Sequence, residues 1–292
     1  MKTLKLGAFV VFLVLCGFIF FTACGNDDSD GNVVLDFDKW TAVADSKFGT
    51  SSIYSIAYGN NTFVAVGESS KMARSTDNGI TWTAVTNSTF GTSIINGIAY
   101  GNNTFVAVAG NDNGKIARST DNGITWTAVA DSTFGTLGIT SIAYGNNTFV
   151  AGGAGKMARS TDNGETWNTV TDSTLSTSVI CSIAYSGNTF VAGGSGGKMA
   201  RSTDNGTTWT AVADSTFDTS NLTFIESITY GNNTFVAVGS GGKMACSTDN
   251  GLTWTAMTDS TFDSSGINGI VYGVNAFVAV GFSGKMARST GK

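Results

Sequence analysis

The sequence contains no histidine and no proline, and only four cysteines. Without histidine the chain cannot form a Ser-His or Cys-His nucleophile pair, nor a histidine-ligated zinc or haem site. Glutamate, which favours helices, occurs only at Glu68, Glu165 and Glu226. What is abundant instead is glycine, at 38 residues, between short runs of Ala, Val, Thr and Phe. This composition predicts an all-β protein.

The chain also has little positive charge. Its net charge is −5 at pH 7, from 16 basic and 21 acidic residues. Removal of the N-terminal segment with Lys2 and Lys5 would leave 14 basic against 21 acidic residues, a net charge of −7. An acidic chain without a basic block is a poor ligand for nucleic acid, so we expect no nucleic-acid partner.

The N-terminus is the one long apolar stretch. Lys2 and Lys5 precede Leu6–Phe21, 16 residues without a charge. A spanning helix needs about 20 apolar residues, so this length is typical of the apolar core of a signal peptide. The stretch ends in Phe21-Thr22-Ala23-Cys24-Gly25. Small residues before a cysteine resemble the bacterial lipoprotein signal, in which the cysteine becomes the lipidated first residue, although Phe21 stands where that pattern usually has leucine.

We therefore predict a signal peptide at residues 1–23 and a lipid anchor at Cys24. An uncleaved anchor and a plain secretory cleavage are the alternatives, and both place the domain outside the cytoplasm. Residues 24–38 are acidic and unpatterned, as expected of a tether. The predicted location is the bacterial cell envelope, at the outer membrane or the cell surface. The remaining cysteines, Cys181 and Cys246, lie at different repeat positions, so we expect two separate thiols.

The mature chain is built from repeats. Six tryptophans are spaced 42, 44, 41, 42 and 45 residues apart, a period typical of a propeller blade with four strands. The first unit is the clearest, because Gly59-Asn60-Asn61 and Asp77-Asn78-Gly79 are turn sequences between apolar runs. The strands it predicts are Ile53–Tyr58, Thr62–Val66, Lys71–Ser75 and Trp82–Val85.

The number of parts predicts how the ring closes. Six sets of the first three strands and six Trp strands occur, but the chain begins with the Trp strand Trp40–Val43 and its last set, ending at Lys285–Thr290, lacks one. The N-terminal strand can complete the last blade and thereby remove two unpaired edges. The predicted fold is a six-bladed β-propeller of four-stranded blades over residues 39–292, closed by the N-terminal strand.

One motif carries a family resemblance. Ser-x-Asp-x-Gly-x-Thr-Trp occurs five times, from Ser75, Ser119, Ser160, Ser202 and Ser247, and resembles the Asp-box or bacterial neuraminidase repeat. In that family the box is a hairpin between the third and fourth strands of a blade, on the side away from the ligand. The family includes sialidases, other glycosidases, sortilin-like receptors and a photosystem assembly factor, so the resemblance implies a fold and not an activity.

We expect the Asp and Trp that recur in each complete box to be structural, because the Asp can accept backbone N–H bonds within the turn and the Trp can cover the hairpin. These residues are Asp77, Asp121, Asp162, Asp204, Asp249, Trp82, Trp126, Trp167, Trp209 and Trp254. The Asp-Asn-Gly sequence lacks the further oxygen ligands and terminal Glu of a calcium loop, so we expect no metal site and no cofactor.

The arginines argue against a sialidase. Such an enzyme needs an arginine triad from non-equivalent positions, a Tyr/Glu nucleophile pair and a separate acid. Here all five arginines share one repeat position beside the Asp-box, and no candidate pair of carboxylates stands out. They are Arg74, Arg118, Arg159, Arg201 and Arg288. We therefore assign no catalytic residue.

Candidate ligand contacts lie where the repeats differ. The second residue of the first strand varies between blades, as Tyr54, Asn96, Thr140, Cys181, Glu226 and Asn268. First strands line the channel of a propeller, so this variation marks either a recognition surface or a position without packing demand. The connection before the fifth blade is longer and carries Leu222 and Phe224. An exposed Phe224 beside Glu226 is the first place to expect a partner.

Two rings of charge are expected on the same face, one of acids or amides and one of lysines, either as solvated charge or as a ligand contact. The first comprises Asp45, Asn87, Asp131, Asp172, Asp214 and Asp259. The second comprises Lys71, Lys115, Lys156, Lys198, Lys243 and Lys285.

The sequence thus favours a non-enzymatic, envelope-anchored binding or adhesion scaffold, monomeric, with a glycan or a protein as partner. The alternative is a sialidase-like glycoside hydrolase, and a further alternative is an assembly factor for an envelope complex.

Overall fold

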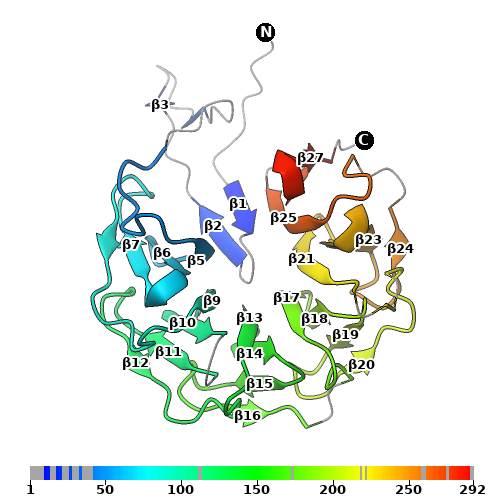
Figure 1. Cartoon of the computed structure of the whole chain (residues 1–292), viewed down its shortest axis with the longest axis horizontal. Coiled ribbons are helices and arrows are strands. Elements are labelled where there is room, and N and C mark those ends of the chain that lie inside the picture. The colour runs from blue at the N-terminus through cyan, green and yellow to red at the C-terminus, as the bar shows by residue number, and fades with distance from the viewer. Residues whose placement is uncertain are drawn as a thin grey trace.

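The structure is a computed structural model of the whole chain. It describes residues 42–110, 114–171, 174–217, 219–220, 222–257, 261–273 and 276–289, together with the backbone of four short strands nearer the N-terminus. The chain forms a β-propeller of six blades arranged around a central axis (Figure 1). The predicted all-β, six-bladed architecture is therefore confirmed, with four antiparallel strands in each of blades 1 to 5 and three in the described part of blade 6.

The blades are numbered 1 to 6 in chain order, and their first strands lie innermost (Figure 1). The first strands are β5 (Ile53–Gly59), β9 (Ile95–Gly101), β13 (Ile139–Gly145), β17 (Ile180–Ser186), β21 (Ile225–Gly231) and β25 (Ile267–Gly273). The second strands are β6 (Thr62–Gly67), β10 (Thr104–Ala109), β14 (Thr148–Gly153), β18 (Thr189–Gly194), β22 (Thr234–Gly239) and β26 (Ala276–Gly281).

The outer strands are shorter. The third strands are β7 (Met72–Ser75), β11 (Ile116–Ser119), β15 (Met157–Ser160), β19 (Met199–Ser202), β23 (Met244–Ser247) and β27 (Met286–Arg288). The fourth strands are β8 (Thr83–Ala84), β12 (Thr127–Ala128), β16 (Asn168–Thr169), β20 (Thr210–Ala211) and β24 (Thr255–Ala256). Single 3₁₀ turns follow three second strands: η1 (Glu68–Ser70), η2 (Ser240–Gly242) and η3 (Phe282–Gly284).

The turn between the first two strands of a blade is set by its sequence. Asn60 and Asn61 both have positive φ, 47° and 56°, as a two-residue hairpin of this twist requires. The flanking Tyr58 and Phe63 then lie opposite each other with ring centroids 4.6 Å apart. Only glycine fits at position 59, because the ring of Tyr100 in the next blade lies 2.0 Å from the place where a Cβ atom would be.

The hydrophobic core lies between neighbouring blades. One cluster joins Val64 and Val66 of blade 1 to Ile95, Phe105 and Trp126 of blade 2, and similar clusters follow around the ring. Each of these clusters contains one tryptophan, which extends from its own Asp-box hairpin onto the preceding blade. Burial of such large side chains between successive blades holds these blades together.

The N-terminal region differs from the expectation in part. Val10–Leu13 (β1) and Phe18–Phe21 (β2) form a hairpin that contacts β25 and β5 respectively (Figure 1). Asn26–Asp27 (β3) pairs with Val33–Val34 (β4) within the segment predicted to be an unpatterned tether. Cys24 lies outside the described residues. No helix in the described part of the chain is long and apolar enough to cross a membrane.

The predicted closing strand stays a prediction. Blade 6 has three strands, β25 to β27, in the described region. Of the expected fourth strand Trp40–Val43, Trp40 and Thr41 lie outside the described residues, whereas Ala42 and Val43 are described, exposed and not in a strand.

Candidate ligand-binding face

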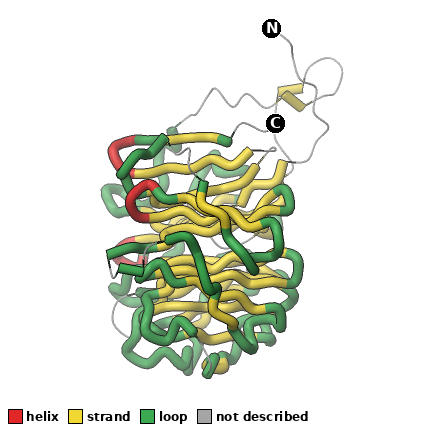
Figure 2. Tube along the Cα trace, turned by 90° about the vertical axis from the view of Figure 1, so that its right-hand side faces the viewer, coloured by secondary structure: helices red, strands yellow, loops and turns green. Residues whose placement is uncertain are grey.

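The propeller has two faces that differ in construction. The Asp-box hairpins and the turns between first and second strands share one face, where Asn60 Nδ2 donates to Asn122 Oδ1 at 2.8 Å. We call this the Asp-box face. The opposite face, here the ligand face, carries the connections between second and third strands and those between blades. The turns η1 to η3 lie along this side (red in Figure 2).

Within the Asp-box the aspartate organises the turn. Asp77 Oδ1 accepts the backbone N–H of Thr81 at 2.9 Å and Oδ2 accepts the Thr81 hydroxyl at 2.6 Å. Hydrogen bonds from Thr81, and then from Ser75, lower the pKa of Asp77 to about 2. The indole N–H of Trp82 donates to the Gly79 carbonyl at 2.9 Å. All of these partners are internal, so the carboxylate is committed to the fold.

The arginines connect neighbouring blades. Arg74 Nε donates to the carbonyl of Asn122 in the Asp-box of the next blade, at 3.0 Å. Arg118, Arg159 and Arg201 repeat this bond onto Asn163, Asn205 and Asn250. In blade 5 the same position is Cys246, and the next blade carries Gly291 where the other boxes have aspartate. The arginine is thus present in each blade that is followed by a complete Asp-box.

The six variable residues share a structural role that the sequence did not reveal. In each blade the pairing of the first and second strands shifts near the ligand face: Ile53 pairs with Gly67, but Ser55 pairs with Val66. Tyr54 is therefore the unpaired residue of a β-bulge, as are its counterparts Asn96, Thr140, Cys181, Glu226 and Asn268. A bulge turns a side chain out of the regular alternation of the strand.

In blades 1 to 3 this residue is satisfied within the protein. Asn96 Nδ2 donates to the carbonyl of Ile139 in the next blade at 2.9 Å. The Thr140 hydroxyl donates to the carbonyl of Ile180, also in the next blade. Tyr54 donates to Glu68 Oε1 at 3.0 Å. Asn96 and Thr140 therefore join neighbouring blades, and Tyr54 makes a contact within its own blade, so variation at this position does not mark a position free of contacts.

Blades 4 and 5 differ. Cys181 and Glu226 lie close enough to interact electrostatically, and both are half-buried. Burial, followed by the Glu226 charge, raises the pKa of Cys181 to about 12, so the thiol stays protonated at neutral pH. Burial also raises the pKa of Glu226. None of the residues that the structure describes donates a hydrogen bond to its carboxylate. Asn268 of blade 6 is exposed.

Two strongly exposed apolar side chains lie in loops of the ligand face, in blades 5 and 6. Leu222 is 87% exposed, and Phe282 in η3 is 61% exposed. The expected exposure of Phe224 is wrong: it is half-buried, because its backbone N–H donates to Ser240 Oγ at 2.9 Å and it bridges to Ser195. Leu222, two residues earlier, is the exposed apolar residue of this connection. The sequence analysis did not identify Phe282, although it is the one aromatic residue at that loop position among the six blades.

Side chains from both rings of charge form hydrogen bonds with backbone atoms of the loops and so stabilise the loop conformation. Lys71 Nζ donates to the Phe48 carbonyl at 2.7 Å, and Lys115 and Lys285 repeat this contact. Asp131 Oδ1 accepts the N–H of Thr133 at 2.7 Å and so supports the left-handed φ of 67° at this β-branched residue. Asp45, Asn87 and Asp214 accept equivalent bonds. Asp172 and Asp259 lie outside the described residues.

Blade 4 departs from this arrangement. Leu175 stands where the other five blades have phenylalanine, and Lys198 donates to Thr177 Oγ1 at 3.0 Å. A pocket of about 320 Å³ opens there between Leu175, Lys198, Asp214 and Phe217. Several departures from repeat symmetry therefore lie on the ligand face of blades 4 and 5.

Comparison with known proteins agrees with this fold. Residues 133–276 match the DUF6242 beta propeller domain, and residues 73–84 and 117–128 match the BNR/Asp-box repeat. No curated protein matches the sequence.

Several solved structures are similar. YCF48 bound to D1 peptide has 18% sequence identity and a TM-score of 0.64 over 82% of this chain and 78% of that chain. YCF48 from Cyanidioschyzon merolae has 18% identity and a TM-score of 0.60 over 82% and 80%. The GH74 xyloglucanase from Xanthomonas campestris has 14% identity and a TM-score of 0.68 over 97% of this chain and 50% of that chain. At these identities the likeness shows the fold alone. The protein is thus a six-bladed β-propeller, with a match to the BNR/Asp-box repeat in two of its blades and a match to the DUF6242 beta propeller domain over residues 133–276.

Proposed function

We propose that this protein is a binding scaffold that holds an extended segment of a protein partner on the ligand face of blades 4 and 5. The observation that carries the proposal is the Glu226 carboxylate, which is half-buried without a hydrogen-bond donor from the described residues. Desolvating a carboxylate without a partner costs free energy. A ligand that brings a lysine or arginine to Glu226 recovers that cost.

The surroundings favour a peptide over a sugar as this ligand. Leu222 and Phe282 offer exposed apolar surface, which suits the side chains of a peptide. The similar YCF48 structure contains a bound D1 peptide, so a propeller of this shape can serve such a role. In this proposal the lipid at Cys24 anchors the propeller in the bacterial cell envelope, and the protein acts there as a monomer.

A binding assay on the full chain tests the proposal. The probes are fluorescent peptides in which one lysine lies between apolar residues, and matched peptides with norleucine at the lysine. Glu226→Gln should weaken binding of the lysine peptides by about tenfold, close to 1.4 kcal/mol. Leu222→Ser should weaken both kinds of peptide. Ile124→Ser, an exposed position on the Asp-box face, is the matched control and should change neither.

Two outcomes would contradict the proposal. One is equal loss of binding from the Ile124→Ser control. The other is product release from a fluorogenic sialoside or a xyloglucan oligosaccharide, which would favour a glycoside hydrolase instead.

A further inference from the structure

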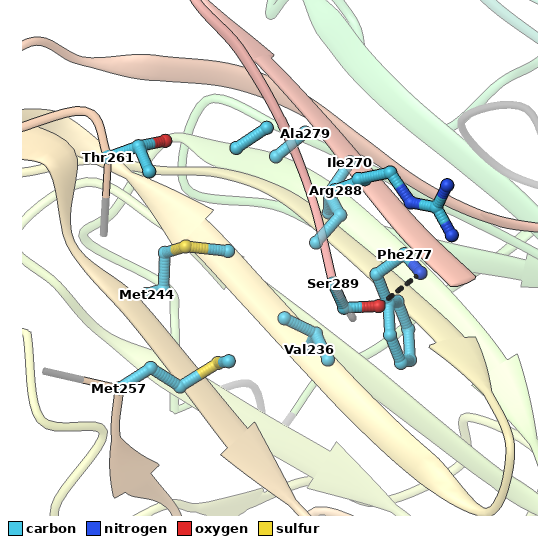
Figure 3. A pocket seen from close by; sticks show the side chains of 10 residues that line it. Val236, Met244, Met257, Thr261, Ile270, Phe277, Ala279, Arg288 and Ser289 are labelled. Atoms are coloured by element: carbon cyan, nitrogen blue, oxygen red, sulfur yellow. Dashed lines mark hydrogen bonds between the residues drawn. The ribbon is translucent and has the colours of Figure 1, made fainter. Parts of the chain in front are cut away.

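The pocket of about 320 Å³ on the ligand face of blade 4 combines both signs of charge with apolar side chains. Leu175 comes from the connection before the blade, Lys198 directly precedes β19, and Asp214 comes from the connection to blade 5. A smaller pocket of about 120 Å³, between blades 5 and 6, differs because its lining is mainly apolar (Figure 3). There the Ser289 hydroxyl already accepts the N–H of Phe277 at 2.8 Å. The blade 4 pocket is thus the better candidate for a polar ligand group.

Lys198 is the one exposed lysine of its ring, whereas the other five are half-buried. Among the described residues, Lys198 donates to Thr177 Oγ1 alone. An ammonium group has three donors, so Lys198 keeps donors for a ligand. The lysines that donate instead to a backbone carbonyl are Lys71, Lys115, Lys156 and Lys285.

The backbone of the connection before blade 4 explains this difference. In four other blades the residue after the loop phenylalanine has a positive φ, between 52° and 71°. These residues are Gly49, Gly91, Gly135 and Asp263. Ser176 stands at this position in blade 4, and its φ is not positive, because a residue with a Cβ rarely adopts the left-handed conformation. The connection therefore brings the Thr177 hydroxyl to Lys198 in place of a carbonyl.

Asp214 supplies the opposite charge. Its Oδ1 accepts the N–H of Thr216 at 2.8 Å, and none of the described residues donates to Oδ2. Lys198 and Asp214 form no ion pair with each other, although the structure describes both. A carboxylate in the pocket would be attracted by one and repelled by the other, and so would an ammonium group. A neutral carboxamide avoids both repulsions, because its oxygen can accept from Lys198 and its nitrogen can donate to Asp214.

The pocket adjoins the exposed surface of Leu222. The N–H groups of Gly196 and Gly197 in the pocket wall donate to the carbonyl of Thr223, at 2.8 and 3.3 Å. Thr223 directly follows Leu222, whose side chain is exposed, and Glu226 lies three residues further along. A peptide that contacts Leu222 can therefore reach the pocket with a neighbouring side chain.

We propose that the blade 4 pocket binds a glutamine side chain of the partner peptide, with the carboxamide between Lys198 and Asp214. The methylene groups of the glutamine lie against the apolar lining of Leu175 and Phe217. This inference rests on the proposed function, because it names a second contact of the same partner. The partner then carries a glutamine at a fixed number of residues from the lysine that meets Glu226.

Fluorescence anisotropy with the full chain tests the pocket. The parent probe is the lysine peptide of the binding assay above, extended with alanine on both sides. A glutamine is placed at each position about two to eight residues from the lysine, which corresponds to about 7 to 26 Å of extended chain. Norleucine, glutamate and a second lysine replace the glutamine in matched peptides.

At one spacing the glutamine peptide should bind about fivefold more tightly than the norleucine peptide, close to 1 kcal/mol, and the glutamate and second-lysine peptides should not. Lys198→Met should remove this gain, whereas Lys115→Met, at the same repeat position in blade 2, should keep it. Asp214→Asn retains an acceptor for the N–H of Thr216 but removes the negative charge. It should therefore shift the preference from glutamine to glutamate, and Asp131→Asn, at the equivalent position after blade 2, should not.

The outcomes separate this inference from the proposed function. No gain from glutamine at any spacing, with lysine peptides still bound and still weakened by Glu226→Gln, would overturn the inference alone. Absence of binding by every lysine peptide would overturn both. Binding of an N-acetylglucosamine oligosaccharide that is lost with Lys198→Met would overturn the assignment to glutamine in favour of the acetamido group of a sugar.

Discussion

At the residue scale, the protein uses carboxylates in two opposite ways. Asp77 accepts hydrogen bonds from Thr81 and Ser75, which lower its pKa to about 2 and make the charged form part of the fold. Glu226 has no such donors among the described residues, and burial raises its pKa. The charged form of Asp77 stabilises the native state, whereas the charged form of Glu226 destabilises it. This contrast distinguishes a structural acid from one available to a ligand.

Glu226→Gln should therefore raise Tm at pH 7. Because the pKa of Glu226 is raised in the folded state, the folded protein binds the proton more tightly than the unfolded chain. The stabilising effect of glutamine should be absent below the unfolded pKa of 4.5, grow as pH rises through the folded pKa, and then stay constant. Calorimetry of both proteins between pH 4 and pH 8, about the range in which such groups titrate, measures this.

Asp249→Asn is the matched comparison at a structural carboxylate. The pKa of Asp249 is lowered to about 2, chiefly by hydrogen bonds from Thr253. The stabilisation of the native state by the ionised Asp249 carboxylate is present above the unfolded pKa of 3.8 and is lost as pH falls toward 2. The asparagine variant should therefore be less stable at pH 7. A gain in Tm for Glu226→Gln that did not depend on pH would contradict the assignment of an uncompensated charge.

At the element scale, the Asp-box hairpin also serves the preceding blade. Arg159 Nε donates to the Asn205 carbonyl at 3.0 Å, and Asn146 Nδ2 donates to Asn205 Oδ1 at 2.7 Å. The hairpin therefore closes its own blade and receives two hydrogen bonds from its neighbour. Gly187 replaces this asparagine in blade 4, and Cys246 replaces the arginine in blade 5.

Replacing the arginine should destabilise the contact between two blades. Arg159→Ala should lower the free energy of unfolding by about 1–2 kcal/mol, because it removes a half-buried hydrogen bond and the packing of the aliphatic stem. Cys246→Ala at the same repeat position should cost less, since Gly291 in the next blade replaces the Asp-box aspartate. Urea unfolding measures both, and equal losses would contradict the role assigned to the arginine.

The regular elements could be predicted because their causes are local. The Asn-Asn and Asp-Asn-Gly turns and the apolar alternation of Ile53–Tyr58 fix where strands begin and end. The bulge at Tyr54 could not be predicted, because it depends on how β5 pairs with β6. The contact of Lys71 with Phe48, 23 residues away, likewise exists only after the blade has folded. The half-burial of Phe224 could not be predicted either, because its contacts with Ser240 and Ser195 are also non-local.

At the scale of the whole molecule, the proposed function depends on the loss of symmetry between blades. A ring of equal blades buries its polar groups in equal contacts, as Arg74, Arg118, Arg159 and Arg201 do. Four departures from that pattern, at Leu175, Cys181, Leu222 and Glu226, lie on the ligand face of blades 4 and 5. A partner that binds one side of such a ring needs this kind of asymmetry.

Site-specific photo-crosslinking in living cells tests this claim most directly. A photoreactive amino acid is placed at Leu222 on the ligand face or at Ile124 on the Asp-box face, two strongly exposed positions in one protein. The account predicts a crosslinked protein partner from position 222 that is lost with Glu226→Gln, and none from position 124. Crosslinking from position 124 alone, or crosslinking from position 222 that is unchanged by Glu226→Gln, would contradict it.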